Sequence, residues 1–298
     1  MSELLNKYHN GIQWIQTIES KYNGPTVTIT ACTHWWELAW EKSIAHLLDY
    51  YQIEQNLTCW KIHLILTNIE WYKKSLTMDR PQDARFIDEN LNRCCSLENL
   101  AISTAYEVQR ALELEPILKQ TDVHFDIHST YTPSQSMLIN TPESQWKFDW
   151  VFNTDVIYSW ITDVQVWKPF IDITIRNWWL WIWIECGDEN DSKVYKIGSE
   201  NSIRLFENLQ MLESWLLMPE SIDQKENKLL QISSSIIVND HTFTPAQNFK
   251  HNQKVKKWEI IAYSTNKNFV AEENLIILLP NPKLIPLEEY CFLARDKS

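Results

Sequence analysis

The sequence predicts an α/β fold, because strand patterns in it are followed by helical ones. Residues 26–31 are rich in β-branched side chains, which favour a buried strand, and residues 37–51 place their apolar side chains near helical spacing. Residues 61–67 and 122–128 predict two further strands. At 298 residues the chain is long enough for a full core and a second, smaller domain.

Local patterns predict the remaining elements. Helices are expected at residues 12–18, 96–119 and 200–217. Beyond a polar stretch rich in lysine and glutamate, short β-rich runs occur at residues 232–238, 258–263 and 275–279. We therefore expect a first domain at residues 1–221 and a small all-β domain at residues 222–298, which packs beside the pocket and narrows it.

The composition argues against several classes of protein. Lys and Arg number 27 and Asp and Glu 39, for a net charge of −12, and no basic run of useful length occurs, so we expect no nucleic-acid partner. No signal-peptide pattern and no run of about 18 apolar residues occurs, so we expect no membrane partner. Six cysteines without C-x-x-C spacing fit reduced thiols in a cytoplasmic protein. The sequence is compatible with a homo-oligomer but does not define the oligomeric state.

A candidate metal-binding pair follows the first predicted strand. His34 and Glu37 form an H-x-x-E pattern at the C-terminal end of that strand, where open α/β sheets place their ligands. Imidazole and carboxylate groups both bind Zn²⁺, which takes one or two more protein ligands and keeps a position for water. The alternative is a surface histidine beside a first-turn glutamate that the helix dipole favours.

A second polar segment contains arginines. Arg85, Asn92 and Arg93 lie within nine residues of one another. They form either a solvated loop or a cradle for carboxylates, with which arginine makes planar, bidentate contacts.

The strand predicted at residues 122–128 carries two histidines. Alternation places His124, Asp126 and His128 on one side of it. Along a strand the two histidines lie about 13 Å apart, so they do not readily share one metal. His128, at the C-terminal end, is the better candidate ligand, whereas His124 is expected to be a packed or surface residue. Asp126 is either a pocket residue or a structural one.

Tryptophan and glycine occur in unusual numbers. The chain has 16 Trp and 4 Gly, whereas a usual glycine share of about 7% predicts roughly 21. Trp35 and Trp36 occupy a turn after a strand, Trp258 occupies a hairpin where a positive φ is normal, and others crowd the segment before Glu185: Trp178, Trp179, Trp181 and Trp183. We hypothesise that most tryptophans stand for glycine, through a UGA codon that the source organism reads as glycine. The alternative is an aromatic surface for sugar or membrane binding.

Four motifs, taken in order, resemble the succinylglutamate desuccinylase/aspartoacylase family, whose members are zinc-dependent relatives of the M14 carboxypeptidases. They are His34-x-x-Glu37, Arg85 with Asn92-Arg93, Asp126-Ile-His128, and Ile184-Glu185-Cys-Gly. Reading Trp as Gly sharpens the match, because residues 34–40 become HGGELAG and residues 183–187 become GIECG. The resemblance spans most of the chain and implies a mixed sheet flanked by helices, as in zinc carboxypeptidases.

The resemblance also implies a role for each site residue. His34, Glu37 and His128 would bind Zn²⁺, and Glu185 would take a proton from water and pass it to the departing amine. Arg85 would stabilise the oxyanion that develops on the scissile carbonyl. Substrate carboxylates would be held by Asn92, Arg93 and Arg176, and Tyr290 resembles a tyrosine that the C-terminal domain lends to the pocket.

These roles predict a zinc-dependent hydrolase of linear amides that deacylates a small, anionic N-acyl amino acid. The alternative is a non-catalytic protein that binds a small molecule or carbohydrate through exposed tryptophans on the same scaffold. The sequence does not define the acyl group.

Overall fold

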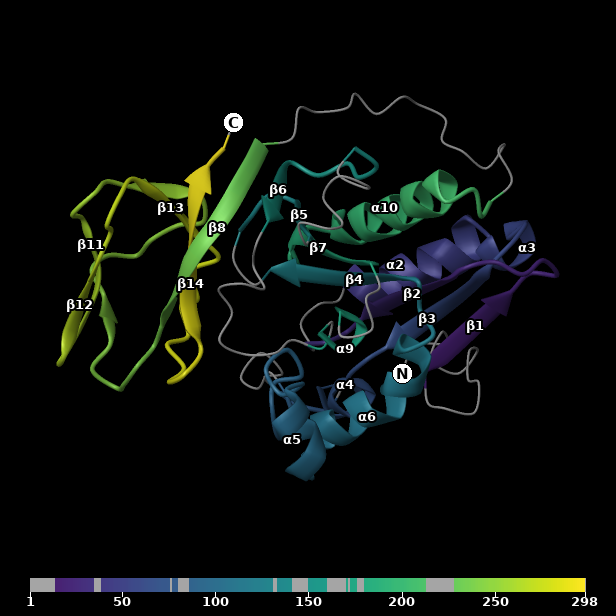
Figure 1. Cartoon of the computed structure of the whole chain (residues 1–298), viewed down its shortest axis with the longest axis horizontal. Helices are drawn as coiled ribbons and strands as arrows, with labels where there is room; N and C mark the ends of the chain where they lie inside the picture. The colour runs from purple at the N-terminus through teal and green to yellow at the C-terminus, as the bar shows by residue number, and fades with distance from the viewer. Residues whose placement is uncertain are drawn as a thin grey trace.

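The computed structural model describes residues 14–34, 39–75, 77–79, 86–130, 133–140, 150–159, 170, 172–175, 180–212 and 228–297. Within them, no helix is long and apolar enough to cross a membrane. Figure 1 shows a sheet with helices on both faces, and a β-rich region at residues 228–297 beside it.

A mixed sheet forms the centre of the molecule, as predicted. Its middle strands are parallel and lie in the order β3 (Lys61–Leu66), β2 (Thr26–Ala31), β4 (Val123–Thr130) and β7 (Leu180–Asp188). At one edge β1 (Ile15–Glu19) runs antiparallel to β3. On the other side β5 (Met137–Asn140) is antiparallel to β7, and β6 (Val156–Ser159) is parallel to β5.

The C-terminal β region continues this sheet through hydrogen bonds. Strand β8 (Lys228–Ile237) pairs in parallel with β6, and beyond it follow β14 (Glu289–Asp296), β13 (Leu275–Leu278) and β10 (Gln253–Val255), which completes an 11-stranded sheet. A separate three-stranded sheet contains β9 (Thr244–Pro245), β11 (Ile260–Ser264) and β12 (Lys267–Val270). The short β-rich runs predicted in this region are therefore strands.

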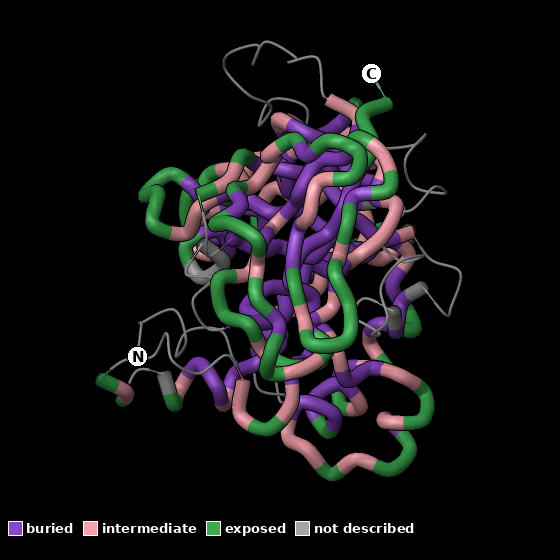
Figure 2. The backbone as a smooth tube through the Cα atoms, turned by 90° about the vertical axis from the view of Figure 1, so that its left-hand side faces the viewer, coloured by how far each residue is buried: buried purple, intermediate pink, exposed green. Residues whose placement is uncertain are grey.

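Two groups of helices cover the sheet. On one face lie α2 (Ala39–Ala45), the π-helix η1 (His46–Tyr50), α3 (Ile53–Asn56) and α10 (Val194–Asn208). On the other lie α4 (Ile69–Ser75), α5 (Leu97–Ile102), α6 (Tyr106–Leu118) and α9 (Asp172–Ile175). The first core contains alternate residues of the strands, such as Val27, Ile29, Phe125 and Ile127. Figure 2 shows that buried backbone occupies the interior of the molecule and that exposed backbone lies on its surface.

Side chains alternate along β2 and β4, so the face of the sheet opposite the first core receives their polar side chains. Thr28 and Thr30 of β2, with His124 and Asp126 of β4, are buried there. The hydroxyl of Thr28 bonds that of Thr121 at 2.6 Å, and Thr30 bonds both His124 (2.7 Å) and Asp126 (2.6 Å). Buried polar groups need such partners, and each of these four side chains has at least one.

The prediction of a helix at residues 12–18 was wrong. Residues 15–19 form β1, which pairs with β3 over its whole length. Ile15 packs among the helices of one face and Ile18 in the core of the other. A segment of seven residues is too short to distinguish the helical spacing of apolar residues from the alternation of a strand. Pairing with the edge of β3 decides its conformation.

The helix predicted at residues 96–119 is two helices. Between α5 and α6, Ser103 and Ala105 have extended backbones. The Ser103 hydroxyl accepts from the Ala105 N–H, and Asp88 accepts from the Tyr106 N–H at 2.8 Å, which begins α6. The other predicted helix, at residues 200–217, begins earlier and ends at Asn208 in α10. Its last residues, from 213 on, lie outside the described part.

Candidate active site

His34 follows β2 at the C-terminal edge of the parallel strands. The chain bends at Cys32, whose φ is 63°, and the Asn68 N–H donates to the Cys32 carbonyl at 3.0 Å, which fixes the bend against the chain after β3. The His34 side chain is buried, and its Nε2 lies 3.0 Å from Oδ1 of Asn90. Its position therefore depends on two loops that are distant in the sequence.

His128 lies near the C-terminal end of β4. Its Nε2 is 2.8 Å from Oδ2 of Asp126, and both side chains are 2% exposed. Burial opposes ionisation of Asp126, but the charge and hydrogen bond of His128, with smaller contributions from His124 and Thr30, hold the pKa of Asp126 below its usual value. Asp126 thus orients the His128 ring.

The structure brings the two candidate histidines together. The centroids of the His34 and His128 rings are 6.0 Å apart and the ring planes are inclined by 51°. This follows from topology, because β2 and β4 are adjacent and parallel and so end at the same edge of the sheet. His124 is buried between Thr30 and Thr174, and burial, the dominant effect, lowers its pKa to about 4. His124 is therefore a packed residue and not a surface residue, the two roles that the sequence analysis allowed.

Glu185 comes to the same place from the next strand. In the pairing of β4 with β7 it is the register partner of His128. It is largely buried, and the indole Nε1 of Trp183 donates to its Oε1 at 3.1 Å. The Trp183 ring also lies 4.9 Å from the His128 ring. The indole therefore lies against both a candidate ligand and the candidate base.

Three predicted site residues, Glu37, Arg85 and Arg176, lie outside the described residues. Among the described residues no group of three or more His, Cys, Asp or Glu side chains is arranged to hold a metal. The described donors at the site are the two imidazoles, with Glu185 beside them.

The loop that carries Asn90, Asn92 and Arg93 is held by one buried carboxylate. Glu107 of α6 is 1% exposed, and its two oxygens accept the backbone N–H groups of residues 87, 88 and 89 at 2.6, 3.1 and 3.1 Å. The Asn68 amide also donates to it at 3.2 Å. Four donors compensate its burial, so Glu107 fixes the path of the loop into the site.

Asn92 and Arg93 are both engaged within the protein. Oδ1 of Asn92, which is buried, accepts from the Phe170 N–H at 3.2 Å. Nη2 of Arg93 lies 2.7 Å from Oε2 of Glu289, at the start of β14, and its Nη1 donates to the Asn92 carbonyl. Glu288 accepts from Asn90 at 3.4 Å. The C-terminal β region thus contributes two carboxylates to this edge of the site.

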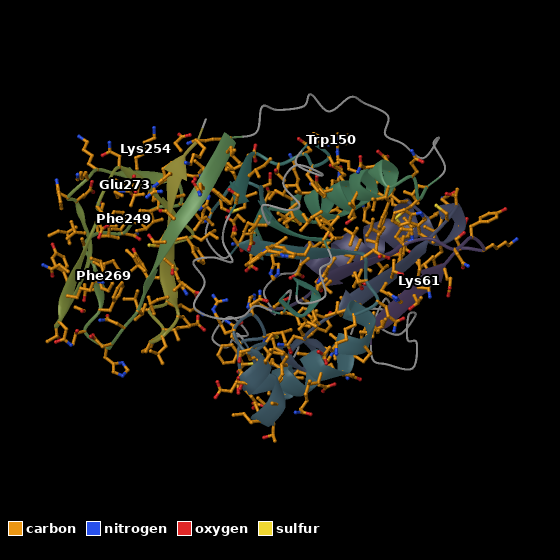
Figure 3. All side chains as sticks on the ribbon, viewed as in Figure 1. Lys61, Trp150, Phe249, Lys254, Phe269 and Glu273 are labelled. Carbon is orange, nitrogen blue, oxygen red and sulfur yellow. The ribbon has the colours of Figure 1, made fainter. Side chains whose placement is uncertain are left out.

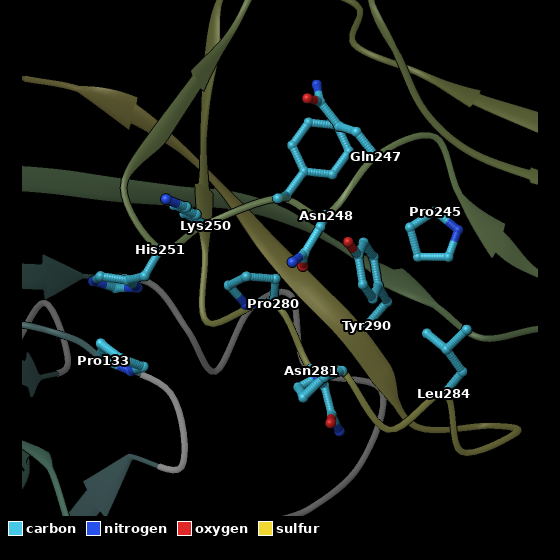
Figure 4. A pocket seen from close by; sticks show the side chains of 12 residues that line it. Pro133, Pro245, Gln247, Asn248, Lys250, His251, Pro280, Asn281, Leu284 and Tyr290 are labelled. Atoms are coloured by element: carbon cyan, nitrogen blue, oxygen red, sulfur yellow. The ribbon is translucent and has the colours of Figure 1, made fainter. Parts of the chain in front are cut away.

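Tyr290 follows these carboxylates and faces the C-terminal β region. Its ring packs 5.4 Å from that of Phe243 and burial raises its pKa. It lines a pocket of about 750 Å³ together with residues such as Asn248, His251 and Pro280, and with Pro133 from the segment after β4 (Figure 4). The described residues that line this pocket do not include His34, His128 or Glu185.

Sequence reasoning missed Asn90, Glu107, Glu288 and Glu289. A signal existed for Glu107, because it shares the apolar stripe of α6 with Val108, Ala111 and Leu114, where a charged residue needs a partner. For the two C-terminal glutamates no local signal existed, since their partners are about 200 positions away in the sequence.

Comparisons with known proteins agree with the geometry. Residues 23–154 match the profile of the succinylglutamate desuccinylase/aspartoacylase catalytic domain. No curated protein matches the sequence significantly.

Similar solved structures extend over nearly the whole chain. They include succinylglutamate desuccinylases from Vibrio parahaemolyticus (13% identity, 95% of this chain and 86% of that one, TM-score 0.73) and from Chromobacterium violaceum (15%, 96% and 89%, 0.70). A product-bound ectoine utilization protein, EutE, from Ruegeria pomeroyi is also similar (13%, 94% and 88%, 0.66). At these identities the similarity shows the fold alone.

Proposed function

We propose, from the match of residues 23–154 to the succinylglutamate desuccinylase/aspartoacylase catalytic-domain profile, that the chain is a zinc-dependent amidohydrolase that deacylates a small N-acyl amino acid. The observation that carries the proposal is the 6.0 Å approach of the His34 and His128 rings at the ends of adjacent parallel strands, with Glu185 in register beside His128.

The two imidazoles fit a metal site in their hydrogen bonding. Nε2 of His34 and Nε2 of His128 are each within hydrogen-bond distance of a side-chain oxygen, of Asn90 and Asp126 respectively. Metal-binding histidines usually donate their other N–H to such an oxygen. The resemblance adds Glu37 as the third ligand. When bound, Zn²⁺ lowers the pKa of a water molecule and polarises the substrate carbonyl.

Glu185 would act as the proton carrier. Its carboxylate takes the proton from the attacking water, whose oxygen forms the new bond to the amide carbon. It then gives the proton to the nitrogen as the C–N bond breaks, so that the products are a carboxylic acid and an amine. Burial beside His128 places the carboxylate where bulk water does not compete for this proton.

The polar loop supports an anionic substrate. Arg93 and Asn92 are held in place by backbone and side-chain contacts, so a substrate carboxylate would meet a prepositioned guanidinium. By resemblance to the family, Arg85 would stabilise the oxyanion and Arg176 would contact the substrate. The family role of Tyr290 is not carried over, because Tyr290 lines a pocket whose described lining includes none of His34, His128 and Glu185. The six cysteines, all within the described residues, form no disulfide with one another, which supports a cytoplasmic location.

The alternative, a carbohydrate-binding protein with an aromatic surface, gains no support from the described tryptophans. The exposed ones among them are Trp150 and Trp258. Trp150 lies near α10 (Figure 3), whereas Trp258 follows β10 and precedes β11 in the C-terminal region. Two indoles so placed do not form a continuous platform.

Three measurements on the natural protein test the proposal: zinc content, hydrolysis of a panel of N-acyl amino acids, and both again in Glu185→Ala. We expect bound zinc and hydrolysis in the wild type, and in the variant retained zinc with a loss of kcat of at least about 100-fold. Glu54→Ala, at an exposed glutamate of α3, is the control and changes neither. Absence of both zinc and hydrolysis in the wild type contradicts the proposal, and loss of zinc from Glu185→Ala would make Glu185 a ligand.

A further inference from the structure

We infer that residues 14, 60, 183 and 258 are glycine in the native protein, because the structure gives each of these tryptophans a place that suits a residue without a side chain. For residues 14, 60 and 258 the reason is backbone conformation. For residue 183 it is the space beside His128 and Glu185, and that part of the inference rests on the proposed function.

Backbone conformation distinguishes three of the tryptophans. Trp14, Trp60 and Trp258 have φ values of 66°, 80° and 71°. Trp accounts for three of the nine non-glycine residues with positive φ in the described part of the chain, although it makes up only 16 of 298 residues. A bulky L-residue is disfavoured there because its Cβ approaches the backbone, whereas glycine adopts this region freely.

Trp258 shows the requirement most directly. The Glu259 N–H donates to the Lys256 carbonyl at 3.0 Å, so Trp258 is the third residue of a four-residue turn. A positive φ at this position is the mark of a type II turn, where glycine is the usual residue. The indole is 70% exposed, so packing does not compensate the strained backbone.

Trp183 conflicts with the site rather than with the backbone. Its indole bonds Glu185 and lies against the ring of His128. A water molecule and a substrate carbonyl would need this same space between base and ligand. Glycine at residue 183 removes the indole and leaves both groups facing an open pocket.

Two other tryptophans have a buried indole N–H group without a hydrogen-bond partner. Nε1 of Trp71 and Nε1 of Trp181 are buried and have no partner among the described residues. A buried donor without a partner is costly, and native proteins contain few. These two indoles point in the same direction as the composition of 16 Trp and 4 Gly, namely that some tryptophans stand for glycine.

The mechanism that would place glycine at tryptophan positions is codon assignment. If the source organism reads UGA as glycine, a translation that reads UGA as tryptophan writes Trp at each such codon. The gene should then carry UGA, not UGG, at residues 14, 60, 183 and 258, and peptides of the natural protein should have the mass of glycine there. Peptides with intact tryptophan at residue 258 would overturn the inference.

Stability provides a test that does not depend on enzyme activity. In the protein expressed with tryptophan, we expect Trp258→Gly to raise Tm by about 2–4 °C. Trp258→Ala should not reproduce the rise, because alanine keeps the Cβ. Trp150→Gly is the matched control, since Trp150 is similarly exposed (63%) but is absent from the residues with positive φ, and it should give no rise. Equal effects of Trp258→Gly and Trp150→Gly would contradict the inference.

The pocket requires a separate measurement. In the protein expressed with tryptophan, Trp183→Gly should raise hydrolysis of N-acyl amino acids at least tenfold, whereas Trp150→Gly should leave it unchanged. If peptide masses show glycine at residue 183 but the natural protein hydrolyses no N-acyl amino acid, the proposed function fails and the glycine assignment stands. If the masses show tryptophan at residue 183, that assignment fails whatever the activity.

Discussion

The guanidinium of Arg93 and the carboxylate of Glu289 are 2.7 Å apart, and this contact ties the loop after α4 to the start of β14. The two side chains are 18% and 3% exposed. Arg93 is expected to hold a substrate carboxylate, yet an internal carboxylate already faces it. The C-terminal β region therefore takes part in setting the charge at this edge of the site.

We predict that Glu289→Gln lowers the free energy of unfolding by about 3 kcal/mol, because a largely buried guanidinium loses its counter-charge. Urea denaturation measures the change. Glu273→Gln is the control, since Glu273 pairs with Arg295 where both side chains are nearly half exposed, and there we expect less than about 1 kcal/mol. Equal losses in the two variants would show that the Arg93–Glu289 pair does not stabilise the protein as argued.

The buried carboxylate of Glu107 should control the loop that carries Asn90 and Arg93. We predict that Glu107→Ala lowers the free energy of unfolding by about 3 kcal/mol or more, because several backbone N–H groups lose their acceptor. It should also raise KM, because the loop loses its path. Glu115→Ala on the same helix is the control, because it removes only the partner of Lys119, whose side chain is 52% exposed. An unchanged KM in Glu107→Ala would contradict the positioning role.

Asp126 should act on metal affinity through His128. We predict that Asp126→Asn weakens zinc binding by about 10- to 100-fold, because the amide no longer holds the imidazole as a carboxylate does. Competition with a chelator of known affinity measures the zinc Kd. Asp122→Asn, just before β4, is the matched control: Asp122 accepts from the Thr26 N–H at 2.6 Å, away from the site. A zinc Kd that changes equally in both variants would rule out a specific effect of Asp126.

Protonation of His251 should destabilise the protein in mild acid. Burial lowers the pKa of His251 from 6.5 to about 4, and its Nδ1 accepts from the Leu279 N–H, which requires the neutral ring. Between these values the unfolded chain binds a proton that the folded one does not. The stabilisation is thus complete above pH 6.5 and is lost towards pH 4, by up to about 3 kcal/mol.

The measurement for His251 is urea denaturation at pH 7 and pH 5. His251→Gln should reduce the difference in unfolding free energy between the two pH values. His241→Gln, at an exposed position in the same β region, should retain the wild-type difference. If His251→Gln and the wild type lose the same stability on acidification, the neutral ring is not responsible.

Much of the central sheet was predictable because its strands carry their own signal. The β-branched run of β2 and the alternation in β4 identify strands without reference to any partner. The same alternation placed Asp126 and His128 on one side, and parallel topology then predicts that His34 and His128 meet at one edge. Where the local signal was short, as at β1, pairing with β3 decided the conformation instead.

Local pattern and composition predicted three strands of the central sheet (β2, β3 and β4), the polar face of β4 and the residue types available for chemistry. The contacts of Asn90 with His34, of Glu107 with the loop and of Glu289 with Arg93 became visible only in the folded chain. These contacts join segments separated by 20 to 196 positions, and a side chain's partner across such a distance is set by how the chain packs, which periodicity does not encode.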